Sequence, residues 1–298
     1  VGSGCQGRYR HQGDPSLHDL KVRRGLSVQY HRPGYYYGAY EAVSSRRADL
    51  RGGQASGIVL RAGIPLCPQD EIARKCGLVT DKTKLKFLGF GTMNGKDGKP
   101  FKTRQGGVMR LENLIKDTQD EMYKKIKEGR DMEDAEARKV ADVVAISALK
   151  YGDLSNQASK DYVFDVDRFT SFEGNTGPYI LYTIVRIKSI LAKYKESGAA
   201  IDENALQTPV NDSEKALMME IAKYNASLEA AYEELAPHKI CAYIYDLANA
   251  FNSFYHETKI LSEENEAQKA SFIQLLKLTK KVLETCIDLL GFSAPDRM

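Results

Sequence analysis

The chain has 298 residues, of which 42% are hydrophobic and 28% are charged, so it is long enough to bury a large core and has the composition of an ordinary globular protein. No apolar run approaches the roughly 20 residues that a membrane-spanning helix needs, and no basic segment followed by an apolar one marks a secretion signal. These features exclude a membrane-spanning protein and lead us to expect a cytoplasmic one.

The net charge of +3 does not indicate a nucleic-acid partner, because the charge is unevenly distributed. Residues 1–71 contain ten basic and six acidic residues, whereas the rest of the chain contains 33 basic and 34 acidic residues. Any surface that binds RNA must therefore be a local basic face on a nearly neutral body.

The cysteines are odd in number and include no C-x-x-C pair, which argues against a disulfide framework and against a zinc site. We expect free thiols and no bound metal. The five cysteines are Cys5, Cys67, Cys76, Cys241 and Cys286.

Composition changes abruptly near residue 72. Residues 1–71 contain nine Arg, one Lys and 11 of the 24 Gly residues, whereas the rest contains eight Arg and 25 Lys in long amphipathic stretches. One interpretation of the first part is a Gly/Arg-rich tail that is disordered or binds RNA. The other is that its codons are read in the wrong frame.

Reading permissible codons one nucleotide later yields peptides typical of a globular protein. The shifted codons of residues 33–42 permit LATIMERMKQ, and those of residues 45–71 permit HPDELIYVVDKRQELYYEQVFRCARKTK. The second peptide places an apolar strand (LIYVV) before a helical pattern, as a nucleotide-binding βα unit does. We therefore predict that residues 1–72 are an aberrant, frameshifted and poorly ordered region of a catalytic domain.

From residue 73 onward the sequence predicts regular elements. Residues 84–91 (KLKFLGFG) predict a strand that enters a glycine turn, and a polar loop follows over 94–107. Apolar residues at helical spacing then predict a succession of helices. The predicted helices cover residues 108–122, 134–151, 176–195, 212–235, 238–256 and 264–290, with an irregular connector over 152–172. The residues expected to face inward in the first two helices are Val108, Leu111, Leu114, Ile115, Val140, Val143, Val144, Ala148 and Leu149.

The polar loop carries basic side chains at Lys96, Lys99, Lys102 and Arg104. Such groups could neutralise charge that develops on a polyphosphate. The residues alone favour the simpler reading of a solvated Gly-Lys-Asp-Gly turn. No G-x-x-x-x-G-K-[ST] sequence occurs, so a P-loop enzyme is excluded.

Histidines and aromatic residues of the later helices predict structural roles. His238 and His256 are not spaced as metal ligands and are expected at helix ends or on the surface. The stripe Tyr243, Phe251, Phe254 and Tyr255 is expected to lie mainly in the core. An exposed tyrosine of this stripe could stack on an unpaired base.

Four blocks, in this order, resemble those of the bacterial-type, class I arginyl-tRNA synthetases. They are FGTMNGKDGKPFKTRQGGVMRLENLI, ALKYGDLSNQASKDYVFDVDRFTSFEGNTGPYILYTIVRIKSIL, HKICAYIYDLANAFNSFYHETKIL and the terminal LLGFSAPDRM. The resemblance is continuous from about Ala73 to Met298, and the FEGNTGPY block and the Arg-Met ending are its most specific parts. It implies a mainly α fold, in which an all-α anticodon-binding bundle at 116–298 is attached to a remnant of a Rossmann-type α/β catalytic domain at 73–115.

The same resemblance implies an arginine-tRNA ligase, which activates arginine with ATP and Mg²⁺ and transfers the arginyl group to tRNA. The residues Lys99, Phe101, Lys102, Thr103 and Arg104 stand where other class I enzymes carry their KMSKS signature. Lys99, Lys102 and Arg104 are the catalytic candidates, and Lys99, Phe101, Lys102 and Thr103 are the candidates for contact with ATP. The candidates for contact with tRNA are Asn175, Tyr179, Tyr182, Arg186, Arg297 and Met298.

The resemblance also implies that this chain lacks part of the active site. The HIGH-type motif lies upstream in the family. The acidic S-T-T-D-L-A block and the glutamine of the D-x-R-Q block, which read the arginine guanidinium, occur only in the shifted reading, as TTDLATI and VVDKRQ. Without that carboxylate the bound cation would be uncompensated. We expect a monomer that binds tRNA, holds no ATP tightly and does not activate arginine. The alternatives are a standalone RNA-binding module with an Arg/Gly-rich tail and a purely structural bundle.

Overall fold

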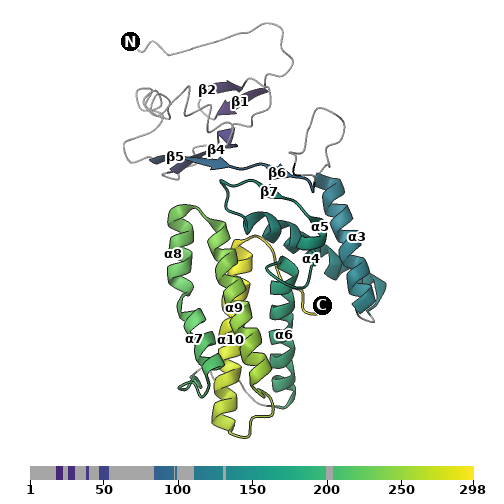
Figure 1. Ribbon diagram of the computed structural model, residues 1–298, viewed down its shortest axis with the longest axis vertical. Coiled ribbons are helices and arrows are strands. Elements are labelled where there is room, and N and C mark those ends of the chain that lie inside the picture. The colour runs from purple at the N-terminus through teal and green to yellow at the C-terminus, as the bar shows by residue number, and fades with distance from the viewer. Residues whose placement is uncertain are drawn as a thin grey trace. The chain divides into compact units, whose positions relative to one another are not determined.

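The computed structural model describes residues 18–22, 26–30, 38–39, 47–53, 84–96, 98, 111–129, 132–198 and 204–298 (Figure 1). The chain divides into two compact units. One comprises residues 1–93 with 158–162, and the other comprises residues 94–157 with 163–298.

The first unit contains short antiparallel strands and one parallel pair. The strands are β1 (His18–Val22), β2 (Leu26–Tyr30), β3 (Gly38–Ala39), β4 (Arg47–Gly53) and β5 (Lys84–Phe90). β1 and β2 pair antiparallel, and β3, β4 and β5 form a second sheet in that order. In it β4 and β5 run parallel, with Ala48 opposite Leu85. A parallel pair requires a crossover connection, as in α/β domains. The predicted strand at 84–91 is confirmed as β5.

The chain after β5 is held by a close backbone contact. The amide of Gly91 donates to the carbonyl of Ala158 at 2.7 Å, and the amide of Tyr162 donates to the carbonyl of Thr92 at 3.1 Å. A Cβ on Gly91 would lie 2.1 Å from the carbonyl oxygen of Lys160, so only glycine fits there. The short strands β6 (Met93–Asn94) and β7 (Tyr162–Val163) pair directly after this contact.

The second unit is almost entirely helical. Its helices are α3 (Leu111–Gly129), α4 (Asp134–Leu154), α5 (Val166–Phe169), α6 (Gly177–Glu196), α7 (Asp212–Ala222), α8 (Tyr224–Glu234), α9 (Pro237–Glu257) and α10 (Glu266–Leu289). α3 packs against α4, and α4 packs against α6; α6, α7, α9 and α10 run side by side as a bundle, with α8 beside α9 (Figure 1). The predicted mainly α architecture is confirmed.

Side-chain caps explain where three of these helices begin. The hydroxyl of Thr176 accepts from the amide of Tyr179, the side chain of Asn211 accepts from the amide of Glu214, and that of Asn265 accepts from the amide of Gln268. Each cap satisfies a backbone donor that the first helical turn leaves unpaired. The starts of α6, α7 and α10 are therefore determined by residues adjacent to them in the sequence.

Apolar stripes of the helices form one continuous core. It includes the fully buried side chains of Met122, Tyr151, Ile184, Leu247 and Phe272. Burying a side chain of this size contributes roughly 1.5–3 kcal/mol relative to leaving it in water. Of the predicted inward residues, Val140, Val144, Ala148 and Leu114 are buried, and Val143, Leu149 and Ile115 are half-buried. The prediction for Leu111 is wrong, because it lies in the first turn of α3 with its side chain 68% exposed. Val108 lies outside the described residues.

The helix boundaries differ from the prediction in three places. The first predicted helix, which is described from Leu111, continues past its predicted end at residue 122 to Gly129. The single helix predicted over 212–235 is two helices, because the chain turns at Lys223 with a ψ of −7° and both halves pack on α9. The connector at 152–172 contains α5 and β7.

Two thiols lie within the described residues. Cys241 and Cys286 are both unpaired and buried, as expected of free cysteines. Burial raises the pKa of each thiol to about 12, so both stay protonated and unreactive. Cys5, Cys67 and Cys76 lie outside the described residues.

The predicted division at residues 72 and 115 stays a prediction. Residue 116, where the all-α domain was expected to start, falls inside α3. Most of residues 1–72, expected to be poorly ordered, lie outside the described part of the chain. None of the described helices is long and apolar enough to cross a membrane.

Candidate RNA-binding face

A group of polar and aromatic side chains lies where α6 and α9 meet. Tyr179, Tyr182 and Arg186 follow one another at helical spacing along α6, so they share one side of that helix. Four residues of α9 at similar spacing lie opposite, and together the seven form what we call the α6–α9 face. The residues from α9 are Tyr245, Asn249, Asn252 and Tyr255.

Hydrogen bonds join the two helices across this face. The hydroxyl of Tyr179 donates to Oδ1 of Asn249 at 2.7 Å. Nδ2 of Asn252 donates to the hydroxyl oxygen of Tyr179 at 2.8 Å. Nη1 of Arg186 donates to Oδ1 of Asn252 at 2.7 Å. The two asparagines therefore fix the positions of both Tyr179 and Arg186.

Aromatic rings flank the guanidinium group. The central carbon of Arg186 lies 4.8 Å from the centroid of the Tyr182 ring and 5.0 Å from that of Tyr255. Both distances fall within the range of a cation–π contact. The rings of Tyr179 and Tyr245 lie 5.7 Å apart and tilted. Arg186 is thus held between two rings while remaining half-buried, with part of its surface open to a ligand.

The charge state of this face is simple. Partial burial raises the pKa of the Tyr179 hydroxyl, so this group is protonated at neutral pH. An arginine guanidinium remains charged at any physiological pH. The face therefore presents one fixed positive charge beside several aromatic rings.

Asn175 has a structural partner. Its Oδ1 accepts from the hydroxyl of Tyr151 at 2.5 Å, and that hydroxyl also lies 2.9 Å from the carbonyl oxygen of Cys241. Burial raises the pKa of Tyr151 well above its ordinary value. Asn175 thus ties the FEGNTGPY segment to α4, while its own side chain remains largely exposed.

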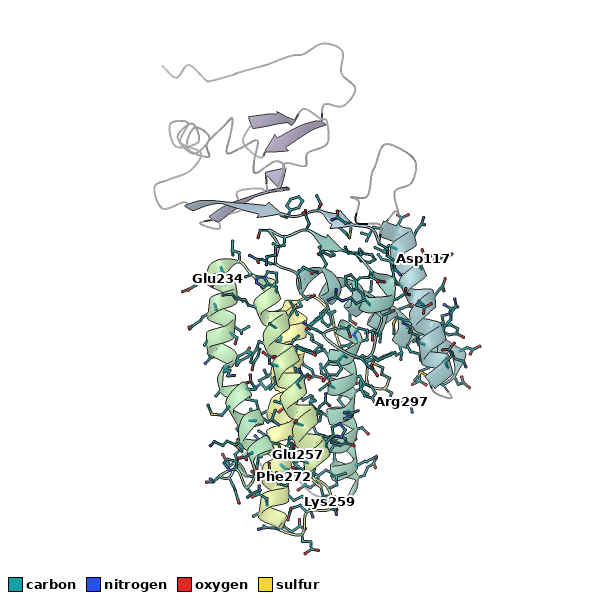
Figure 2. The ribbon with its side chains drawn as sticks, in the orientation of Figure 1. Asp117, Glu234, Glu257, Lys259, Phe272 and Arg297 are labelled. Carbon is teal, nitrogen blue, oxygen red and sulfur yellow. The ribbon has the colours of Figure 1, made fainter. Side chains whose placement is uncertain are left out.

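The C-terminal tail lies on α4 and α6. Arg297 (Figure 2) donates from Nη2 to both carboxylate oxygens of Glu136, at 2.7 and 2.9 Å. Nζ of Lys188 lies 3.2 Å from a carboxylate oxygen of Asp296. The side chain of Met298 is buried in the core with 3% of its surface exposed, which leaves it little surface for RNA. Arg297 is exposed, but most of its donors are already occupied.

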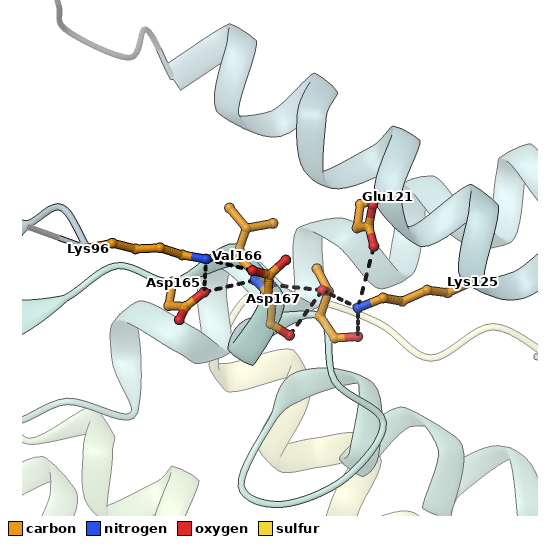
Figure 3. A network of polar contacts seen from close by, with 7 residues as sticks. Lys96, Glu121, Lys125, Asp165, Val166 and Asp167 are labelled. Atoms are coloured by element: carbon orange, nitrogen blue, oxygen red, sulfur yellow. Dashed lines mark hydrogen bonds and ion pairs between the residues drawn. The ribbon is translucent and has the colours of Figure 1, made fainter.

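The predicted ATP-binding loop falls outside the described residues: Lys99, Phe101, Lys102, Thr103 and Arg104 all belong to the part of the chain left undescribed. Lys96, just before them, forms ion pairs with Asp165 at 3.2 Å and Asp167 at 2.6 Å (Figure 3). These carboxylates raise the pKa of Lys96, and its ammonium group lowers the pKa of Asp167. Lys96 therefore serves an internal ion-pair network.

The same network continues to α3. Asp165 caps α5 by accepting from the amide of Asp167 at 3.1 Å. At the other end of α5, Nζ of Lys125 donates to the hydroxyl of Thr170 at 2.7 Å and lies 3.8 Å from Glu121 (Figure 3). α5 is thus held at both ends by lysines from other parts of the helical unit.

Two family models match consecutive parts of the chain. A model described as "tRNA synthetases class I (R), catalytic domain" matches residues 69–166, and one described as "DALR anticodon binding domain" matches residues 180–298. The chain belongs to the arginyl-tRNA synthetase family. The α6–α9 face lies almost wholly in the part that matches the anticodon-binding model of this family.

Named relatives agree with this assignment. The chain is 67% identical over 234 residues to the arginine–tRNA ligase of Agathobacter rectalis. The aligned region covers 76% of this chain and 39% of that protein. The chain is 53% identical over 226 residues to the arginine–tRNA ligase of Alkaliphilus oremlandii, again 76% of this chain and 38% of that protein. The chain therefore spans about two fifths of the length of these synthetases.

Solved synthetases share the fold. The arginyl-tRNA synthetase of Thermus thermophilus superimposes with a TM-score of 0.64 at 24% identity, over 76% of this chain and 38% of that one. The arginyl-tRNA synthetase of Plasmodium falciparum superimposes with a TM-score of 0.60 at 26% identity, over the same shares of the two chains. The prediction of an anticodon-binding bundle attached to part of a class I catalytic domain is confirmed.

The outcomes for the remaining predicted residues are mixed. His238 lies in the first turn of α9 and His256 in its last turn, as expected. Tyr243, Phe251 and Phe254 are buried in the core, and Tyr255 is the exposed tyrosine of the stripe, at 38%. The asparagines of the α6–α9 face were missed. Their spacing of three residues beside the apolar stripe of α9 was the available signal. No group of three potential metal ligands gathers anywhere in the described ranges.

Proposed function

We propose that this chain binds the anticodon arm of an arginine-accepting tRNA through the α6–α9 face and does not itself activate arginine. The observation that carries the proposal is the placement of Arg186 between the rings of Tyr182 and Tyr255. This placement occurs on a bundle that matches an anticodon-binding model.

The chemistry of the face suits an unpaired stretch of RNA. Aromatic rings stack on splayed bases, each worth about 1–3 kcal/mol when the ring is removed. A guanidinium held by neighbouring side chains pairs with phosphate without losing much further freedom. Arg186 supports a phosphate contact, and the exposed Tyr255 and half-buried Tyr182 support stacking. Asn175 and Arg297 remain further candidates at the edges of the bundle.

We infer that the catalytic half is incomplete. In the whole enzyme ATP and Mg²⁺ would meet the loop of Lys99, Phe101, Lys102, Thr103 and Arg104, with Lys99, Lys102 and Arg104 neutralising phosphate charge. Residues 1–72 do not supply the carboxylate or the glutamine that would hold the arginine guanidinium, in keeping with a shifted reading frame. The proposed polypeptide is a cytoplasmic monomer that retains tRNA binding.

Two measurements test the proposal. Fluorescence anisotropy with a labelled anticodon-arm hairpin of the arginine tRNA should show binding that Arg186→Met weakens at least tenfold, and Ser253→Ala, on an exposed position of α9, should bind as wild type. Arginine-dependent ATP–pyrophosphate exchange should be at background for the purified chain. Hairpin binding that is indifferent to Arg186→Met, or measurable exchange, would contradict the respective half of the proposal.

A second candidate follows from the Arg and Gly content of residues 1–71, which is typical of an RNA-binding tail. In that case the chain is a standalone RNA-binding module. Sequencing the encoding DNA separates the two. A one-base insertion or deletion near codons 68–75, together with HIGH-bearing synthetase sequence encoded upstream, supports the synthetase fragment. A reading frame that is intact across these codons supports the standalone module.

A further inference from the structure

The hydrogen bonds of the α6–α9 face have a direction that one residue sets. Arg186 carries only donors and cannot accept a hydrogen bond. The atom of Asn252 that lies 2.7 Å from Nη1 of Arg186 must therefore be the carbonyl oxygen. Because the oxygen and nitrogen of a carboxamide lie on opposite sides of its carbon, Nδ2 of Asn252 must face Tyr179.

The same logic continues through Tyr179 to Asn249. The hydroxyl oxygen of Tyr179 accepts a hydrogen bond from Nδ2 of Asn252 at 2.8 Å. The single hydroxyl proton of Tyr179 is therefore free to be donated to its other neighbour. That neighbour is Asn249, 2.7 Å away, so the contacting atom of Asn249 must be its oxygen. The amide group of Asn249 then points away from Tyr179. Arg186 therefore sets the direction of all three hydrogen bonds, which run from Arg186 through Asn252 and Tyr179 to Asn249.

The reverse orientation of either asparagine is unfavourable. Rotating the carboxamide of Asn252 by half a turn would place its NH₂ group against the guanidinium of Arg186, so that two donors would face each other. Turning Asn249 would leave the proton of Tyr179 without an acceptor at a hydroxyl that is partly buried. Leaving such a group unpaired costs about 1–3 kcal/mol.

Asn249 is exposed and lies on α9 one turn after Tyr245 and one turn before Asn252. We propose that Asn249 is a further RNA-contacting residue, which presents its Nδ2 as a hydrogen-bond donor to the acceptor edge of an unpaired base, in an orientation that Arg186 sets through Asn252 and Tyr179. The inference rests on the proposed function. The rings of Tyr179 and Tyr245 beside Asn249 favour a base over a bare phosphate at this position.

The experiment uses the whole chain and the labelled anticodon-arm hairpin. Asn249→Ala should weaken binding about fivefold, the value expected for one neutral hydrogen bond. Asn252→Leu removes the link that orients Tyr179. In that background Asn249→Ala should therefore weaken binding less than twofold further. Ser253→Ala is the matched control on the same helix. Asn249→Ala also removes the acceptor of the Tyr179 hydroxyl, so its thermal unfolding midpoint should fall, but it should remain well above the temperature of the binding assay.

A set of hairpins with one abasic site at each loop position identifies the contact. The effect of Asn249→Ala should vanish for one abasic position and persist for the others. If it persists for all positions, the contact is to the backbone and the inference is wrong. It is also wrong if the wild type binds and Asn249→Ala binds equally well, or if the two substitutions act independently. A wild-type chain that does not bind the hairpin overturns the proposed function and this inference together.

Discussion

Arg297 forms an ion pair with both carboxylate oxygens of Glu136, in which Nη2 lies 2.7 Å from one oxygen and 2.9 Å from the other. Arg297 is also a candidate for tRNA contact, so the carboxylate competes with phosphate for the same donors. Glu136→Gln should therefore strengthen hairpin binding more than Glu133→Gln, which removes a charge from the exposed N-cap residue of the same helix. Arg297→Met should weaken it. Equal affinities for Arg297→Met and the wild type would show that this arginine has only a structural role.

Gly177→Ala should destabilise the bundle strongly. A Cβ at this position would lie 2.5 Å from the carbonyl oxygen of Ser147, which is backbone and cannot swing aside. Separating the two helices to make room should cost about 2 kcal/mol or more. The matched control is Gly129→Ala at the end of α3, where a Cβ meets nothing within 4 Å. Urea unfolding should show a large loss for the first variant and no loss for the second.

Glu214 should give the bundle a measurable dependence on pH. Its side chain is buried, accepts from the amide of Val210 at 2.8 Å, and has a pKa raised by burial above the ordinary 4.5. The folded state therefore binds a proton more readily than the unfolded state, so this residue's contribution to stability falls as pH rises from 4.5 through the raised pKa. Glu214→Gln should remove that part of the dependence.

The measurement for Glu214 is the free energy of unfolding between pH 4.5 and 7.5. The control is Glu229→Gln on the exposed side of α8, which should retain the dependence of the wild type. Because glutamine can still accept from Val210, the variant should also be no less stable than the wild type at pH 7.5. A variant curve parallel to that of the wild type would argue against a titrating Glu214.

Lys96→Met should change the titration of Asp167. The hydrogen bond and charge of Lys96 hold the pKa of Asp167 below its ordinary value of 3.8, so removing the ammonium group should move the midpoint upward. Carboxyl carbon NMR titration measures this directly. Asp161 is the internal control, because its pKa is lowered by the amide of Thr92, 2.7 Å away, and not by Lys96. An unmoved Asp167 midpoint would mean that the ion pair does not form in solution.

Local signals made much of the fold predictable. Capping side chains at Thr176, Asn211 and Asn265 mark helix starts, and the structure places these starts within two residues of the prediction. The turn at Lys223 was missed because no Gly or Pro interrupts the apolar pattern there. It depends on how both halves pack against α9, which is a tertiary effect.

The candidate face was only half predictable. Tyr179 is the last residue of the FEGNTGPY block, and Tyr182 and Arg186 follow it on the same helix, so a resemblance pointed to them. Asn249 and Asn252 come from a helix about 70 residues later, and their role depends on which of their atoms face α6. Hydrogen-bond direction is a property of the assembled helices, and helical spacing in one segment does not contain it.

The contact at Gly177 has a mechanical consequence. Because the backbones of α4 and α6 nearly touch there, neither helix can roll or slide at that point without carrying the other. A ligand that tilts α6 through Arg186 must then displace α4 as well. α4 and α6 should therefore respond to such a load as one rigid pair.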